Sequence, residues 1–191
     1  MNYLDFIPPE LVIEILLYLD IDEIENLSKI SLNVRDVFNA KLFWIKKLQF
    51  DNMSEYIPFL GRKGTYLEDY KEFMKIEEDI YSILGMTRNF NGWISIKLKK
   101  YVDIRDLIDK YTPKEIGNLV TLGSDNISLT YIEYRGKHKY QYESTFVGNV
   151  NRVIGELSEE EVKLLLIKLR LAGINLDSIT NFEEIYEENE Y

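Results

Sequence analysis

The residues best suited to chemistry lie around a predicted strand near position 130. Asp125, Glu133 and either Arg135 or Lys137 are two acids followed by a base, the residue types that hold a divalent cation for phosphodiester hydrolysis. Nuclease chemistry of this kind needs a Glu-x-Lys spacing, which is absent. His138 is the only histidine, and a histidine base needs an orienting partner that the sequence does not identify. We interpret these residues as the solvated surface of a hairpin.

Composition excludes several further classes of site. The chain has no cysteine and one histidine, so disulfides, thiolate nucleophiles, cysteine-based zinc sites and multi-histidine metal centres are ruled out. Gly117, Gly123 and Gly136 form no phosphate-binding glycine loop. The sequence therefore predicts a protein that is not an enzyme and that uses no cofactor or metal.

Charge and hydropathy limit the partners. The formal net charge of −10 argues against a general nucleic-acid binder, because phosphate binding requires a basic surface. Basic clusters at Lys97–Lys100 and Arg135–Lys139 are interpreted as solvated surface. No apolar stretch approaches the roughly 20 residues of a membrane helix. We expect an intracellular protein, cytoplasmic or nuclear, with no nucleic-acid or membrane partner.

The most unusual element is an apolar run close to the N-terminus. Eight of the nine residues from Leu11 to Leu19 are apolar, and Glu14 is the exception. Pro8-Pro9-Glu10 precedes the run and suits the first turn of a helix. Such a helix has almost no polar face and must be covered on several sides, for which a partner protein is the simplest source.

Patterns further along the chain predict helices followed by a mixed region. Apolar residues at helical spacing indicate short helices up to residue 50. The second of these helices has N-cap oxygens at Asp20–Glu23, with Glu25 in capping-box spacing after Asp22. A long amphipathic helix is expected over 66–84, ending at Gly85. Alternation predicts a strand at 94–98, and two β-rich segments, 127–134 and 139–147, predict a hairpin. Helical segments are expected at 102–111, after Thr112, and after the capping box Ser158–Glu161, the last one closed by Gly173.

This order predicts an α+β fold with an all-α N-terminal module, a linking helix and a small α+β region that contains a β-hairpin. The expected parts are 1–50, the helical module; 51–84, a connecting segment and long helix; 85–180, the α+β region; and 181–191, an acidic tail.

The N-terminal pattern resembles the F-box family. The resemblance rests on Ile7-Pro8-Pro9-Glu10-Leu11, on Leu19-Asp20 at the end of the apolar run, on Ile24, Leu27 and Ile30, and on the closing segment Phe43-Trp44-Ile45-Lys46-Lys47-Leu48. It covers residues 7 to about 49, and the rest of the chain resembles no family. Trp44 is expected to pack inside the module.

The resemblance implies docking on a Skp-type adaptor and, through it, on a cullin–RING ubiquitin ligase, while the C-terminal region recruits a protein substrate. By position, it places seven residues on the adaptor-facing surface: Ile7, Pro8, Leu11, Ile15, Leu16, Leu19 and Ile30. Five of them, Ile7, Pro8, Leu11, Ile15 and Leu16, are expected to be exposed in the isolated chain. The alternatives are an adaptor-bound competitor outside the ligase, or an unrelated α+β enzyme.

Tyrosines in the hairpin offer a possible substrate surface. Tyr131 and Tyr134 lie on its first strand, and Tyr140 and Tyr142 lie on its second. Tyrosine suits recognition surfaces, because it buries a large area at low entropic cost and keeps a hydroxyl group. Cross-strand packing within the sheet is the other interpretation.

Overall fold

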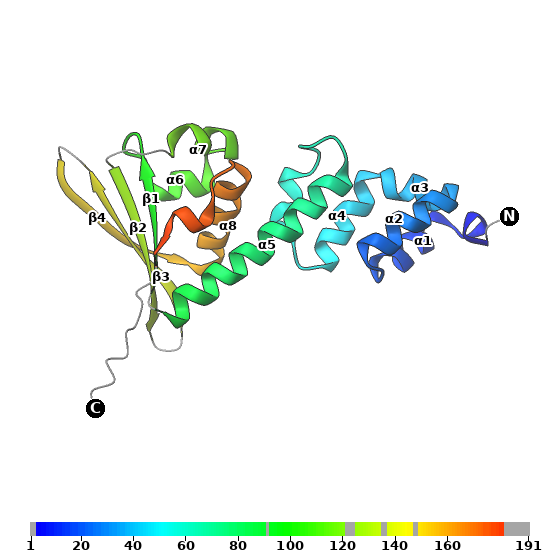
Figure 1. The fold of residues 1–191 in the computed structure, drawn as a ribbon, viewed down its shortest axis with the longest axis horizontal. Helices are drawn as coiled ribbons and strands as arrows, with labels where there is room; N and C mark the ends of the chain where they lie inside the picture. The colour runs from blue at the N-terminus through cyan, green and yellow to red at the C-terminus, as the bar shows by residue number, and fades with distance from the viewer. Residues whose placement is uncertain (1–2, 91, 121–124, 135–136, 147–148, 182–191) are drawn as a thin grey trace, which may run out of the picture. The chain divides into compact units, whose positions relative to one another are not determined.

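The computed structural model describes residues 3–90, 92–120, 125–134, 137–146 and 149–181. The chain divides into two compact units, Met1–Lys75 and Ile76–Tyr191, and the division falls within one long helix. The first unit is all helical and the second combines a sheet with helices, so the fold is α+β as predicted (Figure 1).

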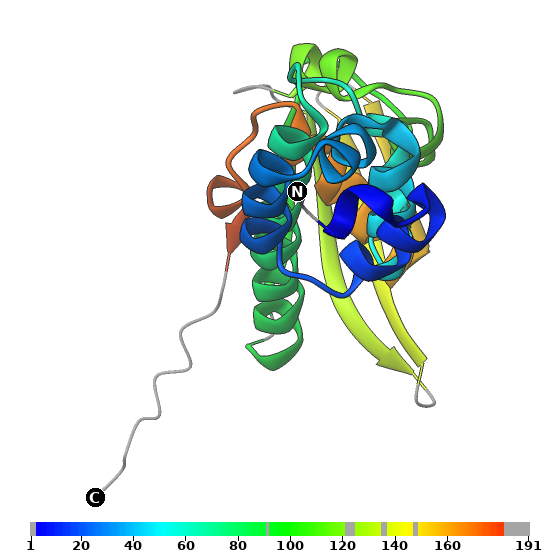
Figure 2. The same ribbon diagram turned by 90° about the vertical axis from the view of Figure 1, so that its right-hand side faces the viewer.

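The N-terminal unit consists of short helices that pack around α3. Its elements are η1 (Tyr3–Phe6), α1 (Pro9–Leu17), α2 (Ile21–Ile30), α3 (Leu32–Asn39), α4 (Lys41–Phe50), η2 (Ser54–Phe59) and the first part of α5 (Tyr66–Asn89). Helix α3 contacts η1, α1, α2 and α4, and the short helices lie close together in both views (Figure 1 and Figure 2).

The starts of these helices follow local chemistry. Pro9 occupies the first turn of α1, as predicted, where a missing N–H is harmless. Helix α2 is capped by Asp20 and not by Asp22, and the Asp20 amide donates to Glu23 (3.0 Å). The predicted capping pair of Asp22 and Glu25 is therefore wrong by two residues, because Asp20 is the residue that keeps an extended backbone.

Aromatic side chains fill the core of this unit. Trp44 is fully buried, and its indole N–H donates to the carbonyl of Phe38 (2.6 Å). Its ring centroid lies 5.1 Å from that of Phe43 and 5.4 Å from that of Tyr70, within the range of favourable aromatic contacts. The expectation that Trp44 packs inside the module is confirmed.

A buried aspartate holds the turn before α5. The Asp69 carboxylate is fully buried and accepts backbone N–H groups from Gly61 (2.5 Å), Arg62 (3.1 Å) and Lys63 (3.1 Å). Gly61 has φ +94°, a conformation that favours glycine. The Asp69 side chain therefore provides the hydrogen-bond acceptors for three backbone N–H groups of a loop that has no regular secondary structure.

Helix α5 runs to Asn89 and passes the residue at which it was predicted to end. Gly85 lies inside the helix and does not adopt the left-handed conformation of a glycine that ends a helix. Ile83, Leu84 and Thr87 around it are buried in the C-terminal unit. Because residues on both sides of Gly85 are packed in the C-terminal unit, the helix continues through this glycine.

The C-terminal unit is built on a five-stranded antiparallel sheet in the order β4-β3-β2-β1-β5. Its strands are β1 (Trp93–Leu98), β2 (Asp125–Tyr134), β3 (Lys137–Phe146), β4 (Asn149–Ser158) and β5 (Thr180–Asn181). The predicted β1 and the β2–β3 hairpin are confirmed. The sequence analysis missed β4, which has asparagines at its first and third positions and contains Gly155, and also missed the two-residue β5.

Helices lie along one side of this sheet (Figure 1). They are α6 (Ile104–Asp109), α7 (Pro113–Leu119) and α8 (Glu159–Leu171), with η3 (Leu176–Ser178) after them. The predicted capping box at Ser158 is present, and Gly173 closes the turn after α8 with φ +84°. Alternate strand residues such as Ile94, Leu129 and Tyr142 form one buried row across the sheet.

A buried lysine joins α8 to the end of α6. The Lys168 ammonium donates to the carbonyls of Ile108 and Tyr111, the latter at 2.9 Å. These carbonyls lie at and beyond the C-terminus of α6, where a helix leaves its last acceptors unpaired. Burial lowers the pKa of Lys168 from its ordinary value.

Candidate functional site

Helix α1 presents an apolar stripe to solvent. Leu11, Ile15 and Tyr18 follow one another at i, i+4 and i+7 and are 54%, 45% and 75% exposed. Val12, Leu16 and Leu17 form the opposite face and are buried. The helix therefore has two apolar faces, one for the core and one for solvent.

Leu16 was expected on the exposed face, and that expectation is wrong. Its side chain is 1% exposed, because Leu16 lies four residues after Val12 on the face that enters the core. Leu11 and Ile15 are exposed as expected, and Pro8 is exposed too. Ile7 is only half-buried and therefore less exposed than expected, and Leu19 is also half-buried.

A second group of exposed apolar side chains surrounds the segment before α1. The side-chain amide of Asn33 donates to the carbonyls of Leu4 (3.2 Å) and Ile7 (2.5 Å), which ties this segment to α3. Phe6 is 68% exposed, Ile30 67% and Leu32 65%. The sequence analysis missed Phe6, Leu32 and Tyr18, although the spacing from Leu11 and Ile15 pointed to Tyr18.

A polar network fixes the C-terminus of α1. The buried Lys47 ammonium donates to the carbonyl of Leu17 (2.9 Å) and to the carboxylate of Asp51 (3.2 Å). The Tyr70 hydroxyl donates to the other oxygen of Asp51 (2.5 Å), and burial together with this bond raises the pKa of Tyr70 well above its usual range. The network connects α1, α4 and α5, so the position of the exposed stripe depends on it.

Two of the four hairpin tyrosines are buried, so the proposed tyrosine surface is wrong for them. Tyr140 is fully buried, and its hydroxyl lies 2.9 Å from that of Thr87 on α5. Burial raises the pKa of Tyr140. Tyr142 is 7% exposed and packs over Gly155, where an added Cβ would lie 2.5 Å from its ring. Both side chains point to the helix-covered face of the sheet.

The other two tyrosines leave little of that surface. The Tyr131 side chain is half-buried, with its ring edge-on to Tyr140 at 5.6 Å between centroids and its hydroxyl bonded to the imidazole of His138. The Tyr134 side chain lies outside the part of the chain that the structure describes. Cross-strand packing therefore accounts for the described members of the set.

The acids and bases near residue 130 are not brought together. Asp125 and Glu133 lie eight residues apart on β2, which is about 27 Å at about 3.4 Å per residue. Arg135 and the side chain of Lys137 lie outside the described residues. Among the described residues, no group of three or more acids and histidines could hold a metal ion.

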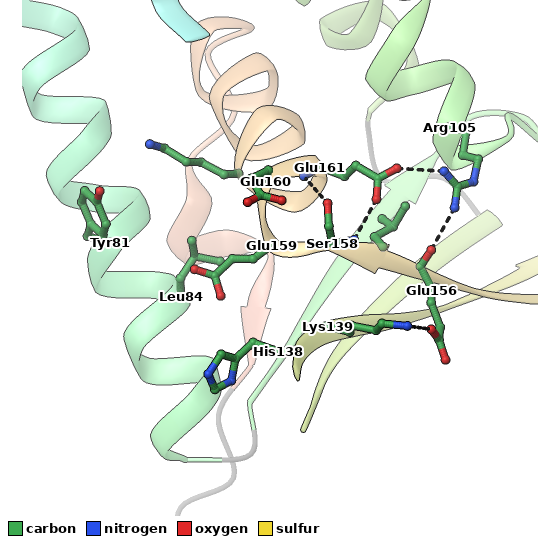
Figure 3. Close-up of a pocket in the computed structure, with 12 residues that line it drawn as sticks. Tyr81, Leu84, Arg105, His138, Lys139, Glu156, Ser158, Glu159, Glu160 and Glu161 are labelled. Carbon is green, nitrogen blue, oxygen red and sulfur yellow. Dashed lines mark hydrogen bonds and ion pairs between the residues drawn. The ribbon is translucent and has the colours of Figure 1, made fainter. Parts of the chain in front are cut away.

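A hollow of about 870 Å³ lies beside the N-terminus of α8 (Figure 3). Figure 3 shows Arg105 between Glu156 and Glu161, donating to the carbonyl of Glu156 (3.0 Å) and to the carboxylate of Glu161 (2.8 Å). Lys139 pairs with the Glu156 carboxylate, and Lys163 pairs with Glu77 (2.6 Å). Arg105, Lys139 and Lys163, three bases that line this hollow, are thus each paired with a neighbouring acid.

The described helices include none that is both long and apolar enough to cross a membrane.

Comparison with known proteins identifies one segment of the chain. No curated protein and no solved structure matches the sequence. Residues 4–46 match the family model of the F-box domain, which ends two residues after Trp44. F-box proteins are typically non-enzymatic adaptors, and the domain indicates a role in an SCF-type ligase through a Skp-type protein. The exposed stripe of α1 and the buried Trp44 therefore lie within residues 4–46, the segment of this chain that matches the F-box domain.

Proposed function

We propose that the chain is a substrate receptor of an SCF-type ubiquitin ligase. Its N-terminal unit docks on a Skp-type adaptor, and its C-terminal unit recruits a protein substrate. The carrying observation is the exposure of Leu11 and Ile15, at 54% and 45%, on a helix within the matched domain. Apolar side chains exposed at helical spacing are typical of a helix that docks on a partner.

The adaptor-facing surface follows from the exposed residues. Its members are the exposed residues Leu11, Ile15, Ile30 and Pro8, together with Ile7 and Leu19, which are half-buried. Phe6 and Leu32, which are also exposed, complete the proposed surface. Leu16 is left out, because its side chain is already buried in the unit's own core.

The magnitude of docking can be estimated for two anchors. Full burial of a leucine or isoleucine stabilises by roughly 1.5–3 kcal/mol, so covering two half-exposed side chains contributes about 1.5–3 kcal/mol in total. Aspartate at both positions also places charge in an apolar interface. Together the losses reach about 3 kcal/mol or more, which is over about a hundredfold in Kd.

The test is co-purification of the full chain with a Skp-type adaptor. Leu11→Asp combined with Ile15→Asp should abolish a 1:1 complex while circular dichroism shows an unchanged fold. Met74→Asp is the matched control, because Met74 is 40% exposed in the same unit but lies outside the matched domain. The proposal fails if the double variant binds like the control.

A reconstituted ligase then tests recruitment. Ubiquitination of a protein that the C-terminal unit captures supports the receptor role. Displacement of other receptors from the adaptor, without ubiquitination of any captured protein, would instead identify an adaptor-binding competitor.

A further inference from the structure

Helix α4 carries exposed apolar side chains that the proposed adaptor-facing surface does not include. Leu42 is 58% exposed and Phe50 is 42% exposed. Together with Lys46 they fall at i, i+4 and i+8, so the three side chains follow one another along one side of α4. Large apolar side chains that gather on a surface are typical of an interaction site.

This side of α4 lies next to the exposed stripe of α1. The ring centroids of Tyr18 and Phe50 are 4.8 Å apart, with an interplanar angle of 75°. One turn earlier, the Lys46 ammonium lies 3.8 Å from the Glu14 carboxylate. Both contacts advance by four residues on each helix, so α1 and α4 run parallel to each other.

The two helices therefore form one apolar face with two ends. The same four-residue step sets Leu42 beside the first turn of α1, where Leu11 lies, and Tyr18 with Phe50 forms the other end. Ile15 lies between the ends on α1. Leu11 and Tyr18 are seven residues apart, which is about 10 Å along the axis at 1.5 Å per residue. These five side chains are named the α1–α4 face.

The charges on the α1–α4 face define the chemistry of its partner. The Glu14 and Lys46 side chains are 60% and 40% exposed, and their ion pair stands between the two apolar ends. An entirely apolar cover would remove water from these charges without replacing its hydrogen bonds. The partner must therefore bring apolar side chains to both ends and a polar side chain to the middle.

We propose that adaptor docking extends from α1 onto α4, and that one amphipathic helix of the adaptor covers the α1–α4 face. Its apolar residues are seven or eight positions apart, and a polar residue between them faces the Glu14–Lys46 pair. Two parallel helices offer a groove of this length to a third helix. The identity of the partner rests on the proposed function. Phe50 lies four residues beyond the segment that matches the family model, so this end of the face is a feature of this chain.

Titration calorimetry of the full chain with a Skp-type adaptor tests the contribution of α4. Leu42→Ala combined with Phe50→Ala should weaken binding by about tenfold or more, because the two half-exposed side chains together equal about one fully buried side chain. Met74→Ala is the matched control. Met74 is 40% exposed in the same unit and lies outside the α1–α4 face, so its truncation should leave the affinity unchanged.

The outcomes separate this inference from the proposed function. If Leu11→Asp with Ile15→Asp abolishes binding while the α4 double variant binds like Met74→Ala, the adaptor docks on α1 without α4 and the extension is wrong. If the parent chain does not bind the adaptor, the proposed function fails and the extension fails with it.

A second measurement does not depend on a loss of affinity. The chain has no cysteine, so Leu42→Cys, Phe50→Cys and Met74→Cys each accept a single environment-sensitive fluorophore. Adaptor binding should shift the emission to shorter wavelength at positions 42 and 50, which become buried, and not at position 74. Equal shifts at all three positions, or none at 42 and 50, would overturn the proposal.

Photo-cross-linking identifies the element that covers the face. A benzophenone on Leu42→Cys and on Phe50→Cys should label one segment of the adaptor at sites about eight residues apart, because two helices that lie side by side rise equally per residue. Labels in two separate adaptor segments would overturn the single helix. Labels in a second copy of the chain would overturn the adaptor as the occupant.

Discussion

Replacing Lys47 by methionine should destabilise the N-terminal unit by about 2–4 kcal/mol. Methionine keeps most of the aliphatic stem but removes the ammonium group, which donates to the Leu17 carbonyl (2.9 Å) and to Asp51 (3.2 Å). The Lys47 side chain is only 7% exposed, so water cannot fully replace these bonds.

The magnitude follows from the groups that are left behind. A buried carbonyl that loses a charged donor costs about 1–3 kcal/mol. Removing one member of a fully buried ion pair costs about 3–5 kcal/mol, but Asp51 is 23% exposed and keeps its bond from Tyr70, which lowers this contribution. Together these figures give about 2–4 kcal/mol.

Lys46→Met is the matched control, because it makes the same change one residue earlier in α4. Lys46 lies 3.8 Å from Glu14, and both side chains are well exposed, at 40% and 60%. Exposed pairs of this geometry contribute at most about 1 kcal/mol and often nothing measurable.

Urea unfolding followed by tryptophan fluorescence measures the difference. The chain has two tryptophans, Trp44 in the first unit and Trp93 in the second. A Trp93→Phe background therefore makes the signal specific for the N-terminal unit, which the two-unit division requires. The reasoning is refuted if Lys47→Met and Lys46→Met differ by less than about 1 kcal/mol, the upper end for an exposed pair.

Three further predictions concern other buried groups. Asp69→Ala should destabilise the N-terminal unit by about 2–3 kcal/mol in the same assay, because three amides lose their acceptor, and Asp69→Asn should fall between it and the parent. The raised pKa of Tyr70 means that the folded protein keeps the phenolic proton at a pH, near 10, where the unfolded chain loses it. The stabilisation that this group provides is therefore complete below pH 10 and decreases progressively as the pH rises above 10. Above pH 10, the free energy of unfolding from urea titrations should fall more steeply with pH for the parent than for Tyr70→Phe, by up to about 1.4 kcal/mol per pH unit, and parallel slopes would contradict this. Gly155→Ala should lower the melting temperature of the C-terminal unit, since a Cβ would lie 2.5 Å from the Tyr142 ring. Adding Tyr142→Leu should recover part of the loss, and no recovery would place the strain elsewhere.

Most helices and the central hairpin were predictable, because their signals are local. Pro9 begins α1, Ser158 with Glu161 begins α8, and alternation marks β1, and each pattern involves residues within one or two turns. Strand β4 gave no such signal, since its pairing with β3 compensates for asparagines and a glycine that disfavour a strand by themselves. Gly85 shows the reverse case, where a local stop signal yields to packing.

The sequence alone determined the order of most elements, the α+β class and the F-box pattern of the N-terminus, all of which depend on spacing along the chain. Only the tertiary structure decided which apolar or polar side chains are covered. Leu16 and Ile15 are neighbours of equal hydrophobicity, yet one enters the core and the other meets solvent. Tyr140 and Lys47 are buried because distant segments supply the Thr87 hydroxyl and the Leu17 carbonyl. Burial of a polar group requires a partner, and a partner far along the chain leaves no mark in the local pattern.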